Sequence, residues 1–204
     1  MAVIVVGGHS RSVGKTSVVA GLIARLPGMR WTAFKITQYG HGFCTADGAP
    51  CDCATDDHTL AFSEERDAAL GTDTARFLAA GAVRSVWVRT RQGMLAEAMP
   101  RLRKQLAAAE NAILESNSVM QFLRPDLYLT VLDAGTADFK DSARLFLDRA
   151  DAALVRATEL EPRWSGISAK LIAGKPQFAI SPPEYVTDAL VEFVRDRVGS
   201  RALL

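Results

Sequence analysis

A glycine-containing loop between a predicted strand and a predicted helix is the feature that most constrains this chain. Residues 3–6 form a β-branched run, and from Lys15 apolar residues recur with helical spacing as far as Leu26. Between these two segments lies the sequence Gly8-His9-Ser10-Arg11-Ser12-Val13-Gly14-Lys15-Thr16. A loop of this kind, which follows a strand and opens a helix with Gly-Lys-Thr, is typical of a phosphate-binding P-loop.

Each part of this loop has a role in holding a polyphosphate. Small residues let successive backbone N–H groups surround phosphate oxygens, and the helix N-terminus adds partial positive charge. Lys15 is expected to bridge the outer phosphates, and the Thr16 hydroxyl to bind Mg²⁺. His9 and Arg11 could both contact phosphate, although we expect the His9 side chain to be solvated. The expected nucleotide contacts are Gly8, His9, Ser10, Arg11, Ser12, Val13, Gly14, Lys15, Thr16 and Ser17.

The rest of the chain alternates between strand and helix patterns. Helices are expected from Lys15 to Leu26, from Met94 to Leu106, over about 142–149, and in a final segment with Val186, Leu190, Phe193 and Val194 apolar. This alternation predicts an α/β fold, a mostly parallel sheet with helices on both faces. The predicted strands are 3–6, 31–36, 83–88, 112–114, 127–132, 152–155 and 178–180.

Composition limits the class of protein further. The 204 residues, of which 49% are hydrophobic, are enough for one core, so we expect a single domain over 1–204. A net charge of +1 argues against a nucleic-acid partner. The apolar runs are too short to cross a membrane, no export signal is recognised at the start, and three cysteines leave no complete pairing, so we expect a cytoplasmic protein without disulfides.

A polar segment at about 40–58 concentrates metal-ligating residue types. It holds all three cysteines and two of the three histidines, and it has no apolar period that would order it by packing. Thiolate and imidazole are the ligands that Zn²⁺ takes, so Cys44, Cys51, Cys53 and His58 form a candidate zinc site, with His41 as an alternative fourth ligand. An iron–sulfur cluster and three unliganded thiols remain alternatives.

The P-loop and several other segments resemble known families. Five residues separate Gly8 from Gly14, one more than usual, and this form resembles the loop of dethiobiotin synthetases and the cobyrinic acid synthase group, in the SIMIBI class of P-loop NTPases. Nearly the whole chain resembles MobB, the molybdopterin-guanine dinucleotide biosynthesis protein B family of the same class. The MobB-like segments are Phe34–Ile36, Thr72–Ala82, Leu114–Ser116 and Pro176–Arg195.

The resemblance implies three further site residues. Glu115 would be the acidic residue near Mg²⁺, at the end of the strand beside the P-loop strand, and Asp73 a second ligand of the metal or its water. The alternatives are a carboxylate that caps a turn for Glu115 and a helix N-cap for Asp73. Lys35 is expected either to approach phosphate or substrate or to extend into solvent from its strand end. Ser116 stands where MobB proteins have glycine.

Three functions follow from these features. The MobB resemblance implies Mg²⁺-dependent nucleoside triphosphate binding with slow hydrolysis, a homodimer, and a partner enzyme in cofactor or metal-centre assembly. The Cys/His segment favours a metal-delivery NTPase for nickel or zinc. The loop spacing and Lys35 favour an ATP-dependent small-molecule ligase. No Asn-Lys-x-Asp guanine-reading motif occurs, so both GTP and ATP remain candidate ligands.

We predict that Cys44, Cys51, Cys53 and His58 bind one metal ion, with Zn²⁺ preferred. The affinity should fall as the pH is lowered, because the ligands must be deprotonated, and chelation should loosen residues 40–58 without unfolding the sheet. Elemental analysis of protein purified without chelator tests this prediction. Metal-free protein with three freely reactive thiols would contradict it.

Overall fold

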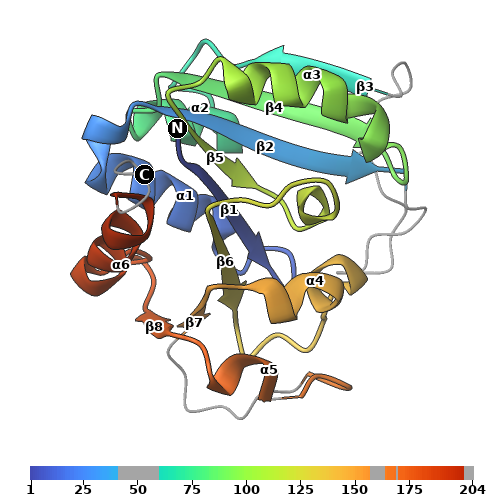
Figure 1. The fold of residues 1–204 in the computed structure, drawn as a ribbon, viewed down its shortest axis with the longest axis vertical. Coiled ribbons are helices and arrows are strands. Elements are labelled where there is room, and N and C mark those ends of the chain that lie inside the picture. The colour runs from blue at the N-terminus through green and yellow to red at the C-terminus, as the bar shows by residue number, and fades with distance from the viewer. Residues whose placement is uncertain (41–59, 157–163, 169, 200–204) are drawn as a thin grey trace.

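The computed structural model describes residues 1–40, 60–156, 164–168 and 170–199. These residues contain an eight-stranded sheet with the strand order β3-β4-β2-β5-β1-β6-β7-β8 (Figure 1). All pairings are parallel except that of the edge strand β3 with β4. The strands are β1 (Val3–Gly8), β2 (Trp31–Tyr39), β3 (Leu60–Glu64), β4 (Arg84–Arg91), β5 (Asn111–Glu115), β6 (Leu127–Leu132), β7 (Ala152–Arg156) and β8 (Gln177–Ile180).

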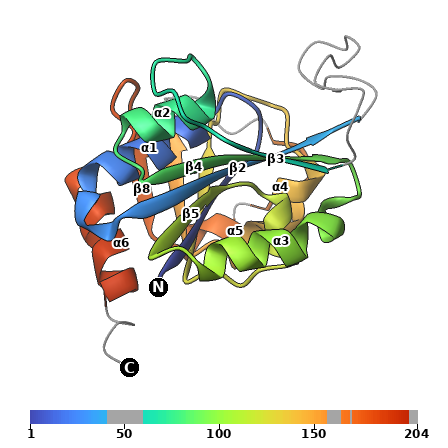
Figure 2. The same cartoon turned by 90° about the horizontal axis from the view of Figure 1, so that it is seen from above.

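Helices cover both faces of this sheet, as predicted. Figure 2 shows α1, α2 and α6 on one side and α3, α4 and α5 on the other. The buried clusters agree with this division, because apolar residues of α1 and α6 share one cluster whereas those of α3 belong to another. The helices are α1 (Lys15–Arg25), α2 (Asp73–Ala79), α3 (Leu95–Ala107), α4 (Asp141–Phe146), α5 (Lys170–Ala173) and α6 (Asp188–Gly199).

The burial of the central strands on both faces explains why the sequence predicted them well. Ile4, Val5 and Val6 of β1 are completely buried, because helices pack against both faces of the sheet at this point. A strand that is buried on both faces is a continuous apolar run and not an alternating one. The predicted strands at 127–132 and 31–36 likewise correspond to β6 and to most of β2.

Several elements differ from the expectation, among them the short helix α5, which no predicted helix covers. The sequence analysis missed β3, whose short, mostly half-buried edge position gives only a weak pattern. The last helix begins at Asp188, so Val186 precedes it. The helix expected at about 142–149 is α4 followed by a 3₁₀ turn over Leu147–Arg149.

The register of the strands places the carboxyl end of β5 between β1 and β2 at one edge of the sheet. Glu115 at the end of β5 pairs with Val6 of β1 on one side and with Lys35 of β2 on the other. The P-loop follows β1 directly. Ligands of open α/β sheets bind at the carboxyl ends of the strands, so this edge is the first place to look for a site. None of the helices in the described ranges is long and apolar enough to cross a membrane.

Candidate phosphate and metal site

The P-loop requires glycine where it enters helix α1. Gly14 has φ +103°, a conformation that residues with a side chain rarely adopt. The ring of Tyr185 packs against it, so that a Cβ on Gly14 would lie 2.2 Å from Cε1 of this ring. The carbonyl of Gly14 then accepts the first helical hydrogen bond, from the N–H of Val18 at 2.9 Å. The last turn of the loop is therefore fixed by both conformation and packing.

Asn117, which lies just after the neighbouring strand β5, holds the start of the loop. Its Oδ1 accepts from the N–H of Gly8 at 2.8 Å, and its Nδ2 donates to the carbonyl of Gly8, also at 2.8 Å. A Cβ on Gly7 would lie 2.2 Å from the same Oδ1, which explains the glycine there. Sequence analysis gave Asn117 no role. The structure shows that it holds the loop backbone.

The expectation that His9 is a solvated loop residue was wrong. Its side chain is completely buried and bonded at both ring nitrogens. Nδ1 lies 2.8 Å from the carbonyl oxygen of Asp138, so it carries the proton, and Nε2 accepts from the N–H of Asp133 at 3.0 Å. The rings of Phe139 and Trp164 lie 5.1 and 5.3 Å away. Both ring nitrogens therefore already have protein partners.

The segment that follows β6 forms hydrogen bonds with the P-loop at His9 and Ser10. Ser10 Oγ donates to Asp138 Oδ2 at 2.6 Å, and the N–H of Lys140 donates to the carbonyl of His9 at 2.8 Å. Arg156 Nη1 holds the carboxylate of Asp133 at 2.9 Å. These bonds fix the loop backbone before any ligand arrives, which lowers the entropy cost of binding.

Four side chains meet at the carboxyl end of β5. Thr16 Oγ1 donates to Glu115 Oε2 at 2.8 Å, and Lys35 Nζ contacts Glu115 Oε1 at 2.5 Å. Lys35 Nζ also lies 2.7 Å from Asp73 Oδ2. The structure thus brings together four residues singled out from the sequence. Lys35 points into the site and does not extend into solvent.

Asp73 is not the N-cap of helix α2. Thr72 takes that position, and its Oγ1 accepts from the N–H of Ala75 at 3.1 Å. Asp73 is therefore free to face Lys35. Burial alone would raise the pKa of the Asp73 carboxyl, but the ammonium of Lys35 outweighs burial and holds this pKa below its usual value.

The two lysines of the site are in different electrostatic states. Burial lowers the pKa of Lys15 to about 8, although Glu115 opposes the shift. Lys15 Nζ donates to the carbonyl of Ser10 within its own loop at 2.5 Å. Burial acts on Lys35 in the same sense, but Glu115 and Asp73 outweigh it, so the pKa of Lys35 is raised. Of these two lysines, Lys35 is the one whose ammonium contacts carboxylates directly within the described residues.

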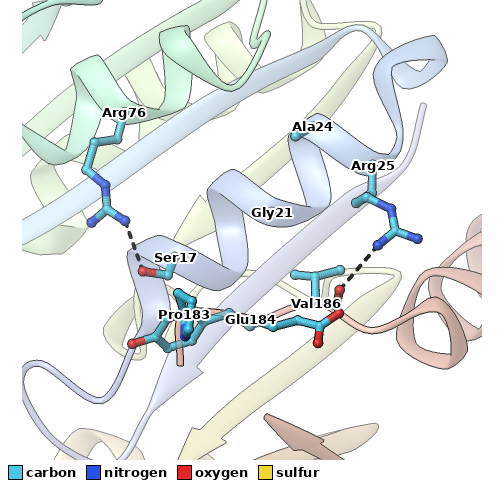
Figure 3. A pocket seen from close by; sticks show the side chains of 9 residues that line it. Ser17, Gly21, Ala24, Arg25, Arg76, Pro183, Glu184 and Val186 are labelled. Atoms are coloured by element: carbon cyan, nitrogen blue, oxygen red, sulfur yellow. Dashed lines mark hydrogen bonds between the residues drawn. The ribbon is translucent and has the colours of Figure 1, made fainter. Parts of the chain in front are cut away.

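An open groove of about 500 Å³ runs along helix α1 from the P-loop (Figure 3). At its loop end, Arg76 Nη2 donates to Ser17 Oγ at 2.9 Å. Gly21 packs closely against Val186 along this groove, because a Cβ on Gly21 would lie 2.5 Å from Val186 Cγ2. The lining residues are Ser17, Gly21, Ala24, Arg25, Arg76, Pro183, Glu184, Tyr185 and Val186.

The oxygen donors fit Mg²⁺. Thr16, Glu115 and Asp73 offer one hydroxyl and two carboxylates, and Mg²⁺ is usually held by one or two carboxylates together with substrate phosphates and water. Within the described ranges, no three His, Cys, Asp or Glu residues gather into a metal-binding group. The expected zinc ligands Cys44, Cys51, Cys53 and His58, and the alternative His41, lie outside the described residues.

A P-loop that joins the central strand of a mostly parallel sheet to its first helix is the architecture of P-loop NTPases, as the sequence predicted. No protein-family model matches the sequence, and no curated protein matches it.

Solved structures that are similar to this chain include LpxK, HypB and MobB. LpxK from Aquifex aeolicus in complex with ATP is 21% identical over 88% of this chain, with a TM-score of 0.49. The chain spans only 53% of that LpxK chain. HypB from Helicobacter pylori in complex with nickel is 13% identical over 97% of this chain and 86% of its own, with a TM-score of 0.49. Bacillus subtilis MobB is 13% identical over 97% and 98%, with a TM-score of 0.42.

We predict that His9 makes stability depend on pH. Burial, the largest effect, lowers its pKa from 6.5, with Lys15 acting in the same sense and Asp133 and Asp138 opposing. Neutral His9 therefore stabilises the fold fully above about pH 6.5, and this contribution is lost as the pH falls below that value. Melting curves from pH 8 to pH 5 should show a steeper loss for the wild type than for His9→Gln.

The double variant His41→Gln/His58→Gln is the matched control, because it keeps His9 and removes the other two histidines. Measured with a chelator present, so that no metal is bound at 40–58, it should retain the wild-type pH dependence. Parallel curves for the wild type and His9→Gln would show that His9 does not cause the dependence.

Proposed function

We propose that this chain binds a nucleoside triphosphate together with Mg²⁺ at the P-loop and hydrolyses it slowly. The observation that carries the proposal is the contact between Thr16 Oγ1 and Glu115 Oε2 at 2.8 Å, directly beside Lys15. It supports the proposal because a hydroxyl and a carboxylate that would hold the cation lie next to an ammonium that would contact the phosphates. The braced loop backbone supports the same function.

The residues divide the work as follows. The loop N–H groups and the N-terminus of α1 would hold the phosphates, and Lys15 would leave the carbonyl of Ser10 to contact the outer phosphate oxygens. Thr16, Glu115 and Asp73 would hold Mg²⁺, which neutralises charge on the β- and γ-phosphates when bound. Glu115 and Asp73 would also accept hydrogen bonds from water at their carboxylate oxygens, which orients it.

The same proposal includes a supporting role in molybdenum cofactor biosynthesis. In this role the protein would act as a homodimer together with a partner enzyme. The MobB-like segments over 34–36, 72–82 and 114–116 support it, and they supply Lys35, Asp73 and Glu115 to one site. We keep GTP and ATP as candidate ligands.

Metal delivery is the second candidate, and the Cys/His-rich sequence at 41–58 favours it. A small-molecule ligase is the third, favoured by the position of Lys35 at the phosphate end of the site. The elemental and nucleotide content of freshly purified protein separates them. A metal that leaves when nucleotide binds would select delivery, whereas a metal that stays would favour the MobB-like function.

Replacing Lys15 by alanine should weaken nucleotide binding about tenfold to a hundredfold, because a hydrogen bond to a charged group contributes about 1.5–3 kcal/mol. The fold should survive, since Lys15 packs in no apolar cluster. Calorimetry with ATP and GTP in Mg²⁺ measures the change. Lys104→Ala, on an exposed surface of α3, is the control, and equal affinity for Lys15→Ala would contradict the P-loop assignment.

Replacing Glu115 by glutamine should preserve nucleotide binding and lower turnover about 10- to 100-fold, because a neutral amide holds the cation and its water less well. Phosphate release at saturating nucleotide measures this. Glu110→Gln changes an exposed carboxylate just before the opposite end of β5 and should leave turnover unchanged. Full turnover in Glu115→Gln would reduce Glu115 to a structural role.

A further inference from the structure

Lys35 lies between the two carboxylates that we assign to the metal. Its Nζ is 2.5 Å from Glu115 Oε1 and 2.7 Å from Asp73 Oδ2. The other oxygen of Glu115 accepts from Thr16. An ammonium in the free protein is thus bonded to both proposed carboxylate ligands of the cation.

Burial explains why a cation is needed there. The side chain of Glu115 is 2% exposed and that of Lys35 is 19% exposed. A carboxylate removed from water in this way needs a partner of opposite charge, because an unpaired buried charge is strongly destabilising. Asp73 is 40% exposed, and Arg76 Nη1 lies 4.0 Å from its second oxygen. Glu115 therefore depends on Lys35 more than Asp73 does.

The two carboxylates and the two lysines at the centre of the free site balance in charge without a metal. Glu115 and Asp73 carry two negative charges, and Lys15 and Lys35 carry two positive charges when protonated. A divalent cation that enters alone would meet two ammonium groups and leave positive charge unbalanced in a partly desolvated site. A triphosphate that enters with the cation brings more negative charge than the cation carries.

We propose that Lys35 is a positioning residue that holds the place of the divalent cation in the free protein. The cation then binds only together with nucleotide and displaces the Lys35 ammonium from Glu115 and Asp73. This inference rests on the proposed nucleotide site, and it adds an order of binding. Free Mg²⁺ is excluded, and the metal–nucleotide complex is the species that binds.

Binding of Mn²⁺ without nucleotide, followed by electron paramagnetic resonance, tests the proposal. Lys35→Met removes the ammonium and keeps much of the side-chain length, so this variant should bind Mn²⁺ at least about tenfold more tightly than the wild type. Lys35→Arg keeps the positive charge and should bind as weakly as the wild type. Removing a purely structural ion pair would also free the two carboxylates, so the displacement of Lys35 by the metal–nucleotide complex is measured as well.

Two controls locate the gained site. Lys104→Met removes an exposed lysine elsewhere and should bind Mn²⁺ like the wild type. Lys35→Met/Glu115→Gln should lose the gained affinity, because it removes the more buried carboxylate. Equal affinity of the wild type and Lys35→Met for free Mn²⁺, whether tight or weak, would overturn the proposal.

A second measurement uses the wild type and does not depend on whether Lys35→Met folds. Nuclear magnetic resonance of lysine ammonium groups should show a signal for Lys35 that is absent in Lys35→Arg. Free Mg²⁺ should leave this signal in place, whereas Mg²⁺ with ATP or GTP should shift it. A shift with Mg²⁺ alone, or no shift with the complex, would contradict the proposed displacement.

The failure of the nucleotide site and the failure of this inference can be told apart. If calorimetry finds no nucleotide binding by the wild type, the proposed function fails, and the Mn²⁺ comparison still decides whether Lys35 excludes cations. If the wild type binds the Mg²⁺–nucleotide complex but Lys35→Met gains no Mn²⁺ affinity, only the role of Lys35 fails.

Discussion

The register of β5 between β1 and β2 is the constraint on which the site depends. It places Glu115 beside Val6, two residues before the P-loop begins, and beside Lys35 on the other side. Parallel pairing brings the carboxyl ends of all three strands to one edge, so the loop, the carboxylate and the ammonium meet there without any long excursion of the chain. A register slip of one residue would turn Glu115 to the opposite face of the sheet.

Polar contacts from segments far along the chain hold the loop in shape. Asn117 bonds both backbone groups of Gly8, and His9 is enclosed by the segment after β6. Buried polar networks are favourable only when every member is satisfied, and both groups here have their partners. The result is a phosphate loop that requires little ordering on binding, which is the general way in which a protein gains affinity without new contacts.

Local patterns predicted the sheet and most of the site, and they failed where the contacts are distant in sequence. The apolar runs around Val5 and over 127–132 marked buried strands, and the Gly-Lys-Thr motif marked the loop. His9 was misjudged because its partners Asp133 and Asp138 lie 124 and 129 residues further along the chain. Strand β3 was missed because one face of an edge strand carries little apolar pattern. No local rule reports such tertiary contacts.

The opposite pKa shifts of the two lysines separate their roles. Lys15 and Lys35 are both withdrawn from water, yet the pKa of Lys15 is lowered to about 8 whereas that of Lys35 is raised. The difference arises because Glu115 and Asp73 contact Lys35 directly, whereas the Lys15 ammonium, among the described residues, contacts the neutral carbonyl oxygen of Ser10. The carboxylates are thus compensated by Lys35, and Lys15 remains the poorly compensated cation. In the proposed function, a phosphate oxygen would supply the charge that Lys15 lacks, so Lys15 would be the centre of the electrostatic attraction for phosphate.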